Sequence, residues 1–288
     1  ARRRPVRVGY LGPPGTFAEE ALLELVGTAS ELEAVPFPTV VECFRAVREG
    51  EVPEALVPIE NSIEGSVNQT LDQLAAGGDR LCIRAEVVHP VRHHLIARTP
   101  LAPADVTRVI SHPHATAQCQ AFLRERMPGA EVGAANSTAD AVRTVMAADE
   151  PWAAIGTLRA ADLYGGAVIA ADIEDTEDNS TRFVLLGAEP APAVGPGRFR
   201  TSIICAIERD RPGALLAILQ EFAMRAVNLS KLESRPTKTG LGRYLFFIDI
   251  EGSRERDLPV DAAITAIEQQ GVASVTFLGS YPAAAVPG

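Results

Sequence analysis

The chain has 288 residues, and its 27 basic residues against 37 acidic ones give a formal net charge of -10. This acidic balance disfavours nucleic acid and anionic membranes as partners, and it means that an anionic ligand would need a locally prepared site. No apolar run reaches the ~18 residues of a membrane span. We therefore expect a cytoplasmic protein, with no membrane partner, of two domains, the usual division at this length.

Lysine is nearly absent, since Lys231 and Lys238 are the only two and the first 230 residues contain none. A Schiff-base lysine, a pyridoxal phosphate anchor and a P-loop lysine are therefore impossible in that part of the chain. The four cysteines lack Cys-x-x-Cys spacing, which argues against a disulfide framework or a structural zinc site. We expect no cofactor.

The five histidines also lack the pattern of a metal site. His112 and His114 flank a proline at a strand-to-helix turn, and no paired carboxylate lies near them in the sequence. His93 and His94 are adjacent on an extended run and must face opposite ways. We interpret all five, His89 included, as structural and predict that no metal is bound.

Strands and helices alternate along the first part of the chain. In chain order we predict strand 6–11, helix 16–26, strand 32–37, helix 39–49, strand 55–59, helix 66–76, and two extended runs at 83–88 and 91–98 that are broken by Pro90. A second set follows: strand 108–111, helix 115–126, strand 131–135, helix 138–148, strand 153–155, helix 158–164, strand 168–171 and, after an acidic segment, strand 182–186. Two α/β lobes joined by two crossings fit this order.

The remainder of the chain predicts a separate unit. Residues 187–197 are dense in Pro, Gly and Ala, which is typical of a semi-extended linker. Beyond them we predict strand 201–207, helix 213–225, strands 229–234 and 244–250, helix 260–270 and strand 275–281. This βαββαβ order is the ferredoxin-like unit.

Four predicted helices begin at uncharged polar or glycine turns, at residues 15–16, 62–66, 111–114 and 136–138. A helix N-terminus offers unsatisfied N–H groups and a partial positive charge, so several of them aimed at one cleft would bind an anion without lysine. Ordinary capping explains any one of these turns alone. Their convergence on a crevice between the lobes would favour a ligand site.

Residues 60–62 (Glu-Asn-Ser) directly follow a buried strand, where α/β folds expose functional side chains. Asn61 and Ser62 are candidates for ligand contact. Glu60 has two interpretations of equal standing: it orients neighbours or transfers a proton, or it forms a structural ion pair with an arginine.

Residues 179–183 (Asn-Ser-Thr-Arg-Phe) place the Thr181 hydroxyl beside the Arg182 guanidinium, at the end of an acidic loop and the start of a strand. Such a pair can bind and polarise an anion. The alternative for Arg182 is a buried structural pair with Glu60 or with the acids of residues 172–178. Phe183 fits the core as the first inward residue of the strand.

Together with residues 9–17, 58–62, 111–115 and 233–236, this segment resembles prephenate dehydratase fused to an ACT regulatory domain. The resemblance covers roughly residues 6–281 and implies a two-lobed, periplasmic-binding-protein-like (type II) α/β catalytic domain at 5–187. Lobe 1 would span about 5–83 and 178–187, and lobe 2 about 84–177. A linker at 188–200 and a ferredoxin-like ACT domain at 201–281 would follow.

The resemblance implies that prephenate loses carbon dioxide and hydroxide to give phenylpyruvate, carbon dioxide and water in phenylalanine biosynthesis. Thr181 would stabilise the departing oxygen. Arg182 would hold the pyruvyl carboxylate, because clamping the carboxylate that is lost would stabilise the ground state. The other substrate-binding residues it implies are Gly15, Thr16, Asn61, Ser62, Ser111 and Phe183. Ala18 departs from the family pattern, where Ser or Thr is usual.

For the second domain the resemblance implies a phenylalanine site at an interface between two copies of the chain, in a homodimer or homotetramer. The residues that match are Gly213, Ala214, Leu215, Asn228, Leu229 and Ser234. A plain dimerisation module is the alternative. For the whole chain the alternatives are an arogenate dehydratase, or a two-lobed ligand sensor without chemistry, because such a fold is mainly a binding fold.

Overall fold

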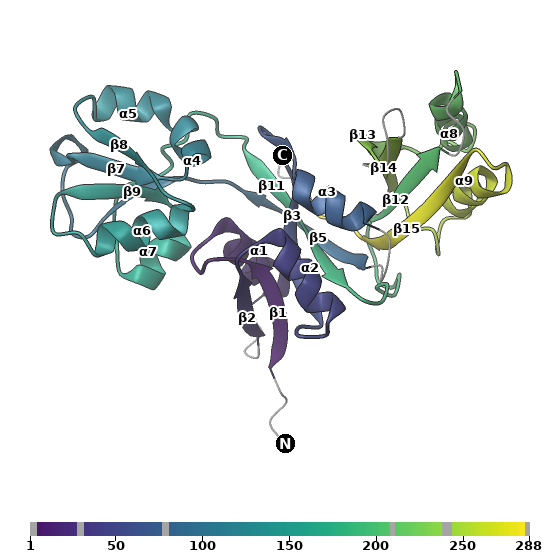
Figure 1. Cartoon of the computed structure of the whole chain (residues 1–288), viewed down its shortest axis with the longest axis horizontal. Helices are drawn as coiled ribbons and strands as arrows, with labels where there is room; N and C mark the ends of the chain where they lie inside the picture. Colours follow the sequence, from purple (N-terminus) through teal and green to yellow (C-terminus); the bar gives the residue numbers. More distant parts are fainter. Residues whose placement is uncertain (1–4, 28–31, 77–80, 208–210, 238–243, 286–288) are drawn as a thin grey trace.

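The structure is a computed structural model, and it describes residues 5–27, 32–76, 81–207, 211–237 and 244–285. Figure 1 shows three bodies in a row, each built on its own β-sheet: lobe 1 in the centre, lobe 2 on the left and the C-terminal domain on the right. Lys238, one of the two lysines of the sequence, lies outside the described residues, as do residues 1–4. None of the described helices is long and apolar enough to cross a membrane.

Lobe 1 is a mixed sheet with helices on both faces. Its strand order is β2-β1-β3-β11-β5, formed by β1 (Val6–Leu11), β2 (Leu32–Phe37), β3 (Glu54–Asn61), β5 (Cys82–Pro90) and β11 (Ser180–Gly187). The helices are α1 (Phe17–Val26), α2 (Val40–Arg48) and α3 (Asn68–Ala75). Helix α3 starts two residues later than predicted, because Gly65–Ser66 forms a short strand, β4, that pairs with the end of β3.

The two faces of the lobe 1 sheet bury separate apolar clusters. Leu22 of α1 packs with Leu56 and Phe183 on one face, while Phe44 of α2 packs with Val184 on the other. Neighbouring residues of β11 therefore point to opposite faces, as strand geometry requires. Each of these side chains is almost completely buried, which contributes roughly 1.5 to 3 kcal/mol per side chain.

Lobe 2 is a second α/β unit with strand order β10-β6-β9-β7-β8. Its strands are β6 (His94–Ala97), β7 (Arg108–Ser111), β8 (Glu131–Ala134), β9 (Trp152–Gly156) and β10 (Ala167–Ala170), and its helices are η1 (Pro103–Asp105), α4 (Pro113–Ala117), α5 (Gln120–Arg126), α6 (Thr138–Met146) and α7 (Leu158–Tyr164). The helix predicted at 115–126 is therefore two helices. The cause is Asp175, whose N–H donates to Gln118 O at 2.7 Å and whose carboxylate accepts from Ala121 N at 3.0 Å, at the start of α5.

Two crossings join the lobes, as predicted, and they run side by side. Val91 N donates to Asn179 O at 2.8 Å, and Ile173 N donates to His93 O at 2.9 Å. The buried carboxylate of Glu174 accepts from His93 N at 2.9 Å. These bonds tie the first crossing to the second and set where one lobe faces the other.

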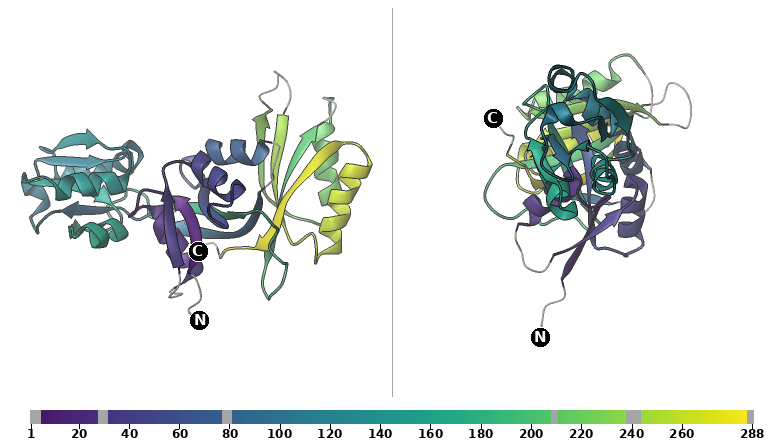
Figure 2. Two further views of the ribbon diagram at one scale, coloured as in Figure 1. Left: turned by 60° about the horizontal axis from the view of Figure 1, so that its bottom comes forward. Right: turned by 90° about the vertical axis from the view of Figure 1, so that its left-hand side faces the viewer.

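The C-terminal domain has the predicted βαββαβ order. It comprises β12 (Phe199–Ile207), α8 (Ala214–Ala223), β13 (Leu229–Pro236), β14 (Tyr244–Glu251), α9 (Leu258–Gln269) and β15 (Ala273–Pro282), in a sheet of order β13-β14-β12-β15. Figure 2 shows both helices on the side of this sheet away from lobe 1. The predicted fold class, a two-lobed α/β domain followed by a ferredoxin-like domain, is confirmed.

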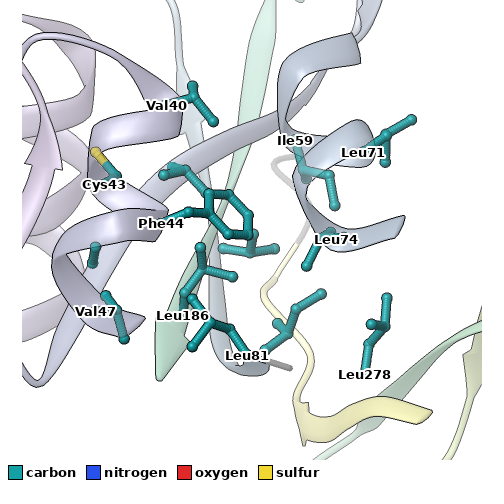
Figure 3. Packing of buried hydrophobic residues seen from close by; sticks show 14 of the residues in the cluster. Val40, Cys43, Phe44, Val47, Ile59, Leu71, Leu74, Leu81, Leu186 and Leu278 are labelled. Carbon is teal, nitrogen blue, oxygen red and sulfur yellow. The ribbon is translucent and has the colours of Figure 1, made fainter. Parts of the chain in front are cut away.

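The C-terminal sheet shares a hydrophobic core with lobe 1. Leu278 of β15 belongs to the same cluster as Leu74 and Leu186, and Figure 3 shows these side chains together. Gly279 allows the approach: a Cβ there would lie 2.3 Å from Ile83 O, and its φ of +141° is one that L side chains rarely adopt. The second domain is thus packed directly against lobe 1.

Candidate active site between the lobes

A cleft of about 610 Å³ lies between lobe 1 and lobe 2. Its polar lining side chains are Thr16, Asn61, Glu64, Ser66, His93, His112, His114, Gln118, Asn136, Ser137, Thr138, Asn179 and Thr181. Within the described residues, neither arginine nor lysine contributes to this lining. An anion held here would depend on N–H groups, hydroxyls, amides and imidazoles.

The cleft collects the four helix starts that the sequence singled out, since residues from the turns before α1, α3, α4 and α6 all line it. Ser137 caps α6 by accepting from Asp140 N at 2.9 Å. Thr16 does not cap α1 with its side chain, because its hydroxyl donates to Leu11 O at 3.2 Å. The first-turn N–H groups of α1 therefore have no side-chain cap and remain suited to an anion.

Strand β11 contributes to two different environments. Thr181 and Phe183 line the cleft, whereas Arg182 between them does not. The reason is the alternation of side chains along a strand, which directs adjacent residues to opposite faces of the sheet.

A β-bulge in β3 adjusts the facing strand. Arg182 pairs with Glu60 and Phe183 pairs with Pro58, so that Ile59 is an extra residue opposite this step. An extra residue reverses the alternation of side chains. As a result Glu60 shares the face of Arg182, while Pro58 and the residue after Glu60 both line the cleft.

The hydrogen bond between Asn61 and Thr181 has a defined direction. Asn61 Oδ1 accepts from the backbone N–H groups of Ile63 and Glu64, both at 2.9 Å. This fixes the orientation of the amide, so Nδ2, which only donates, is the atom 2.9 Å from Thr181 Oγ1. Thr181 therefore accepts this bond. No acceptor in the described part of the chain takes its own hydroxyl hydrogen, which is available for a ligand in the cleft.

Three further side chains join this hydrogen-bond network, which converges on the Gln118 oxygen. Asn61 Nδ2 also donates to Asn179 Oδ1 at 2.9 Å, and Asn179 Nδ2 donates to Gln118 Oε1 at 2.8 Å. His93 Nε2 lies 3.0 Å from the same Gln118 oxygen, which can only accept. His93 therefore carries a proton on Nε2, and the four side chains hold one another in a single arrangement.

The protonation state of His93 agrees with this arrangement. Burial lowers its pKa, although the hydrogen bond to Gln118 acts in the opposite direction. The ring is therefore neutral at pH 7, and its Nδ1, buried without a partner in the described structure, is unprotonated. Burial also lowers the pKa of His112, with the nearby His114 adding to the effect.

Arg182 is turned away from the cleft. Its Nε donates to Glu86 Oε2 at 2.8 Å, and its Nη1 donates to Asp249 Oδ2 at 2.6 Å. Its Nη2 donates to Tyr281 Oη at 3.1 Å. The prediction that Arg182 holds the pyruvyl carboxylate is wrong for this structure, because every nitrogen of the guanidinium is engaged on the other face of the sheet. The alternative of a buried structural pair fits, with Glu60 as a weaker partner at 3.6 Å.

Three other predicted contacts also lie outside the lining. Gly15 instead joins the lobes, because its carbonyl accepts from Thr157 Oγ1 at 2.7 Å. Ser111 is fully buried and donates to Ile155 O at 2.8 Å. Ser62 is exposed, and its hydroxyl bonds the backbone of the acidic crossing. Each of these groups has a structural partner, so none is presented to the cleft.

Of the predicted contact residues, the structure brings together Thr16, Asn61, Thr181 and Phe183. Sequence reasoning missed several lining residues: Glu64, His93, His112, His114, Gln118 and Asn179. His93, His112 and His114 line the cleft, and the structural interpretation of the histidines stays a prediction. Asn179 carried a signal, since it begins the segment that contains Thr181, whereas Gln118 carried none. The described residues contain no group of three or more His, Cys, Asp or Glu placed to hold a metal ion.

His89 anchors α1, whose start lines the cleft, and it supports a prediction about pH. Its ring nitrogens lie 2.8 Å from Glu24 Oε2 and 3.1 Å from Glu20 Oε2. Burial lowers its pKa, but the two carboxylates outweigh burial and the net pKa is raised above the ordinary 6.5. The protonated ring therefore stabilises the fold fully below pH 6.5, and this contribution is lost as pH rises through the raised pKa.

We expect His89→Gln to lower the free energy of unfolding more at pH 6 than at pH 9, as measured by urea denaturation at both values. The wild-type and variant curves should approach each other as pH rises. If the difference in unfolding free energy between the wild type and the variant instead grew toward pH 9, the ion pairs of His89 with Glu20 and Glu24 would be contradicted.

The C-terminal domain has its own pocket, of about 430 Å³, at the start of α8. Gly213, Ala214 and Leu215 line it, and the φ of Gly213, +85°, suits glycine at this turn. Asn228, Leu229 and Ser234 do not line it. Ser234 lies on β13 opposite Phe246, which is a lining residue.

A two-lobed α/β domain with a polar cleft between its lobes, followed by a ferredoxin-like domain with its own pocket, is the architecture of a protein that holds a small molecule between two lobes. The chain belongs to the prephenate dehydratase family. It matches the family described as prephenate dehydratase over residues 8–191 and the ACT domain over residues 201–269.

Individual relatives agree with this assignment. A prephenate dehydratase of Mycolicibacterium vanbaalenii is 40% identical over 98% of this chain and 92% of its own length. The structure of a prephenate dehydratase of Arthrobacter aurescens in complex with L-Phe has a TM-score of 0.87 and 38% identity, covering 98% of this chain and 93% of its own. A protein described as a novel type of quorum quenching acylase has a TM-score of 0.84 and 28% identity, covering 96% and 98%. The shared fold therefore accompanies more than one described activity.

Proposed function

We propose that this chain converts prephenate to phenylpyruvate, carbon dioxide and water in the cleft between its lobes, and that phenylalanine regulates it through the ACT domain. The observation that carries the proposal is the Thr181 hydroxyl, which accepts from Asn61 Nδ2 at 2.9 Å and so directs its hydrogen to a ligand. Hydroxide is a poor leaving group, and a donor aimed at the departing oxygen is what this reaction needs.

The reaction breaks two bonds. The bond from the ring to its carboxylate breaks, the electron pair passes through the ring, and the carbon–oxygen bond at the opposite ring position breaks. The departing hydroxide takes up a proton and leaves as water. Thr181 is too weak an acid to supply a full proton, so its role is a hydrogen bond that strengthens as negative charge develops on the oxygen.

The absence of arginine and lysine from the described lining suits decarboxylation. The ring carboxylate loses its charge as it departs, so a cation beside it would stabilise the ground state and oppose the reaction. Apolar lining residues such as Phe17, Val91 and Phe183 are compatible with a group that becomes neutral. The pyruvyl carboxylate keeps its charge, and the N-terminus of α1, which has no side-chain cap, is suited to hold it.

Incubation of the purified protein with prephenate, with phenylpyruvate as the measured product, tests this proposal. Arogenate is the necessary comparison, because Glu64 in the cleft lining could attract the amino group of that substrate. A higher kcat/KM for arogenate would make the chain an arogenate dehydratase. No product from either substrate would favour the ligand sensor.

An acylase activity is less compatible with the cleft. Amide hydrolysis by a side-chain nucleophile needs a hydroxyl or thiol within hydrogen-bond reach of a base. Among the described lining residues, the His93 ring bonds Gln118, the His112 ring accepts from His114 N, and the His114 ring lies 3.9 Å from Glu64 Oε2. No lining Ser or Thr hydroxyl bonds a histidine ring in this part of the structure. Release of the acyl group from an N-acylated amide is the control assay, and we expect none.

For regulation we propose that Gly213, Ala214 and Leu215 contribute to a phenylalanine site completed by Asn228, Leu229 and Ser234 of a second copy. Exposed apolar side chains in the ACT domain support such pairing; they are Leu216, Met224 and Leu232. We further propose that the chain is a cytoplasmic homodimer or homotetramer with the catalytic domain at 5–187, a linker at 188–200 and the ACT domain at 201–281.

Thermodynamic linkage makes the regulation testable. If phenylalanine weakens substrate binding, a non-reacting substrate analogue must weaken phenylalanine binding by the same factor, typically ~5- to 150-fold. Calorimetric titration of phenylalanine with and without the analogue measures this factor. Full-length protein that binds no phenylalanine would leave the ACT domain as an assembly module.

A further inference from the structure

At the paired ends of β3 and β11, adjacent residues face opposite sides of the sheet. Asn61 and Thr181 are paired and line the cleft. Glu60 and Arg182 form the adjacent pair, and they face the ACT domain, with Glu60 Oε2 3.6 Å from Arg182 Nη1. The two pairs are neighbours on both strands, so a displacement of Glu60 and Arg182 would act on the backbone that positions Asn61 and Thr181.

Lys231 of β13 reaches this point from the ACT domain. Its Nζ lies 3.2 Å from Glu60 Oε1 and donates to Ser66 Oγ at 2.8 Å. It also lies 3.2 Å from Glu233 Oε2 on its own strand. Ser66 lines the cleft as part of β4, which pairs with the end of β3 at Glu60. One ammonium group from the ACT domain therefore contacts both a wall of the cleft and the residue beside Asn61.

Strand β13 also carries Ser234, which the proposed function assigns to the phenylalanine site of a second copy. Its burial alternates residue by residue: Lys231 and Glu233 are largely buried toward lobe 1, and Ser234 is exposed. Ser234 pairs with Phe246, which lines the pocket at the start of α8. We expect a displacement of β13 at Ser234 to move Lys231, which lies three residues away on the same strand.

Lys231 is the cation that holds the contact between β13 and the end of β3 together. Its side chain is only 9% exposed, and it lies between the carboxylates of Glu60 and Glu233. Without the ammonium, the two carboxylates would lose the cation between them, and their repulsion would be only partly screened because the Glu60 side chain is 39% exposed and that of Glu233 24% exposed. Ser66, which bonds both Lys231 and Glu233, would keep only its bond to Glu233.

We propose that Lys231 is a positioning residue that couples the ACT domain to the catalytic cleft, through Ser66 directly and through Glu60 to the Asn61–Thr181 pair. The inference rests on the proposed regulation by phenylalanine and names its route. It requires no contact between Lys231 and the substrate.

The matched control lies on the same strand. Arg235 also faces lobe 1 and forms an ion pair with Asp72 Oδ1 at 2.7 Å, with a further bond to Asn68. Both partners belong to α3, outside the described cleft lining. Lys231→Met and Arg235→Met therefore each remove one cation from the same interface, and only the first removes it from the cleft side. Lys231→Arg keeps the charge.

The first measurement is amide hydrogen exchange of residues 60–67 in full-length protein with and without phenylalanine, which does not depend on turnover. We expect phenylalanine to change exchange there in the wild type and in Arg235→Met. The change should shrink at least threefold in Lys231→Met and be partly restored in Lys231→Arg. Calorimetry should show that the variants still bind phenylalanine.

The second measurement is the ratio of prephenate KM with and without saturating phenylalanine. Lys231→Met should reduce this ratio at least threefold while its kcat without phenylalanine stays within about threefold of wild type. The inference is overturned if bound phenylalanine leaves residues 60–67 unchanged in the wild type, if Lys231→Met keeps the full effect, or if Arg235→Met loses as much. Wild-type protein that shows the exchange change but does not consume prephenate would refute the proposed activity and leave the coupling route standing.

Discussion

Replacing Thr181 by valine should lower kcat by roughly 100-fold or more and leave KM for prephenate little changed. Valine keeps the shape of threonine and removes the hydroxyl, whose hydrogen bond to the departing oxygen matters mainly in the transition state. The structure sharpens this expectation, because Asn61 Nδ2 occupies an acceptor position of Thr181 Oγ1 at 2.9 Å. The hydroxyl hydrogen is then committed to the ligand.

The control for this experiment is Thr181→Ser, which keeps the hydroxyl and should retain most of the turnover. Steady-state kinetics of the three proteins at one pH, with their unfolding curves, separates chemistry from folding. A soluble Thr181→Val protein with near-normal kcat would show that another group stabilises the leaving oxygen. Equal losses in both variants would instead assign the effect to packing.

The periodicity of the sequence was sufficient for the architecture. Alternating short apolar runs and amphipathic segments predicted two α/β lobes and a βαββαβ unit, because burial on one or both faces dictates those patterns locally. The predicted helix boundaries were wrong where a residue distant in the sequence bonds the backbone of the helix. Asp175, on the second crossing, bonds the backbone at Gln118 and Ala121 and so divides one predicted helix into two.

The candidate site was predicted in part, for a similar reason. Helix starts that collect at the cleft are readable from their turn residues, and Asn61 and Thr181 follow or begin strands. Gln118 was not predictable, since it reaches Asn179 and His93 only because the helix is interrupted beside it. That interruption comes from tertiary contacts, which no local pattern contains.

The sequence alone could have shown that the Arg182 side chain points away from the cleft. Adjacent residues of a strand point to opposite faces, so Thr181 and Arg182 could not both face one cleft from a regular strand. The partners of Arg182 on the other face of the sheet could not be predicted from the sequence. Glu86 and Asp249, the acids that pair with Arg182, are 96 and 67 residues away in sequence, and Asp249 belongs to a domain whose docking on lobe 1 leaves no periodic signal.

Arg182→Met should lower the free energy of unfolding by about 3 to 5 kcal/mol, because it leaves buried acids without their cation. The Glu86 side chain is 0% exposed and that of Asp249 is 6% exposed. Burial lowers the pKa of Arg182, but Asp249 and the other partners outweigh burial and the net pKa is raised, so the guanidinium stays charged at every working pH. Arg200 also pairs with Glu86, so Glu86 would keep one cation and the loss of stability would be smaller than if it had none.

Arg182→Lys should be destabilised as well, since one ammonium cannot reach Glu86, Asp249 and Tyr281 in the geometry of a planar guanidinium. Urea denaturation measures both variants, with Arg98→Met as the control, because the Arg98–Asp149 pair is exposed and such pairs contribute little. A substrate anchor would behave differently: KM for prephenate would rise steeply while the unfolding curve stayed at its wild-type position. That outcome would return Arg182 to the cleft and contradict the ion cluster, whereas a loss of stability in both variants assigns Arg182 to the contact between lobe 1 and the ACT domain.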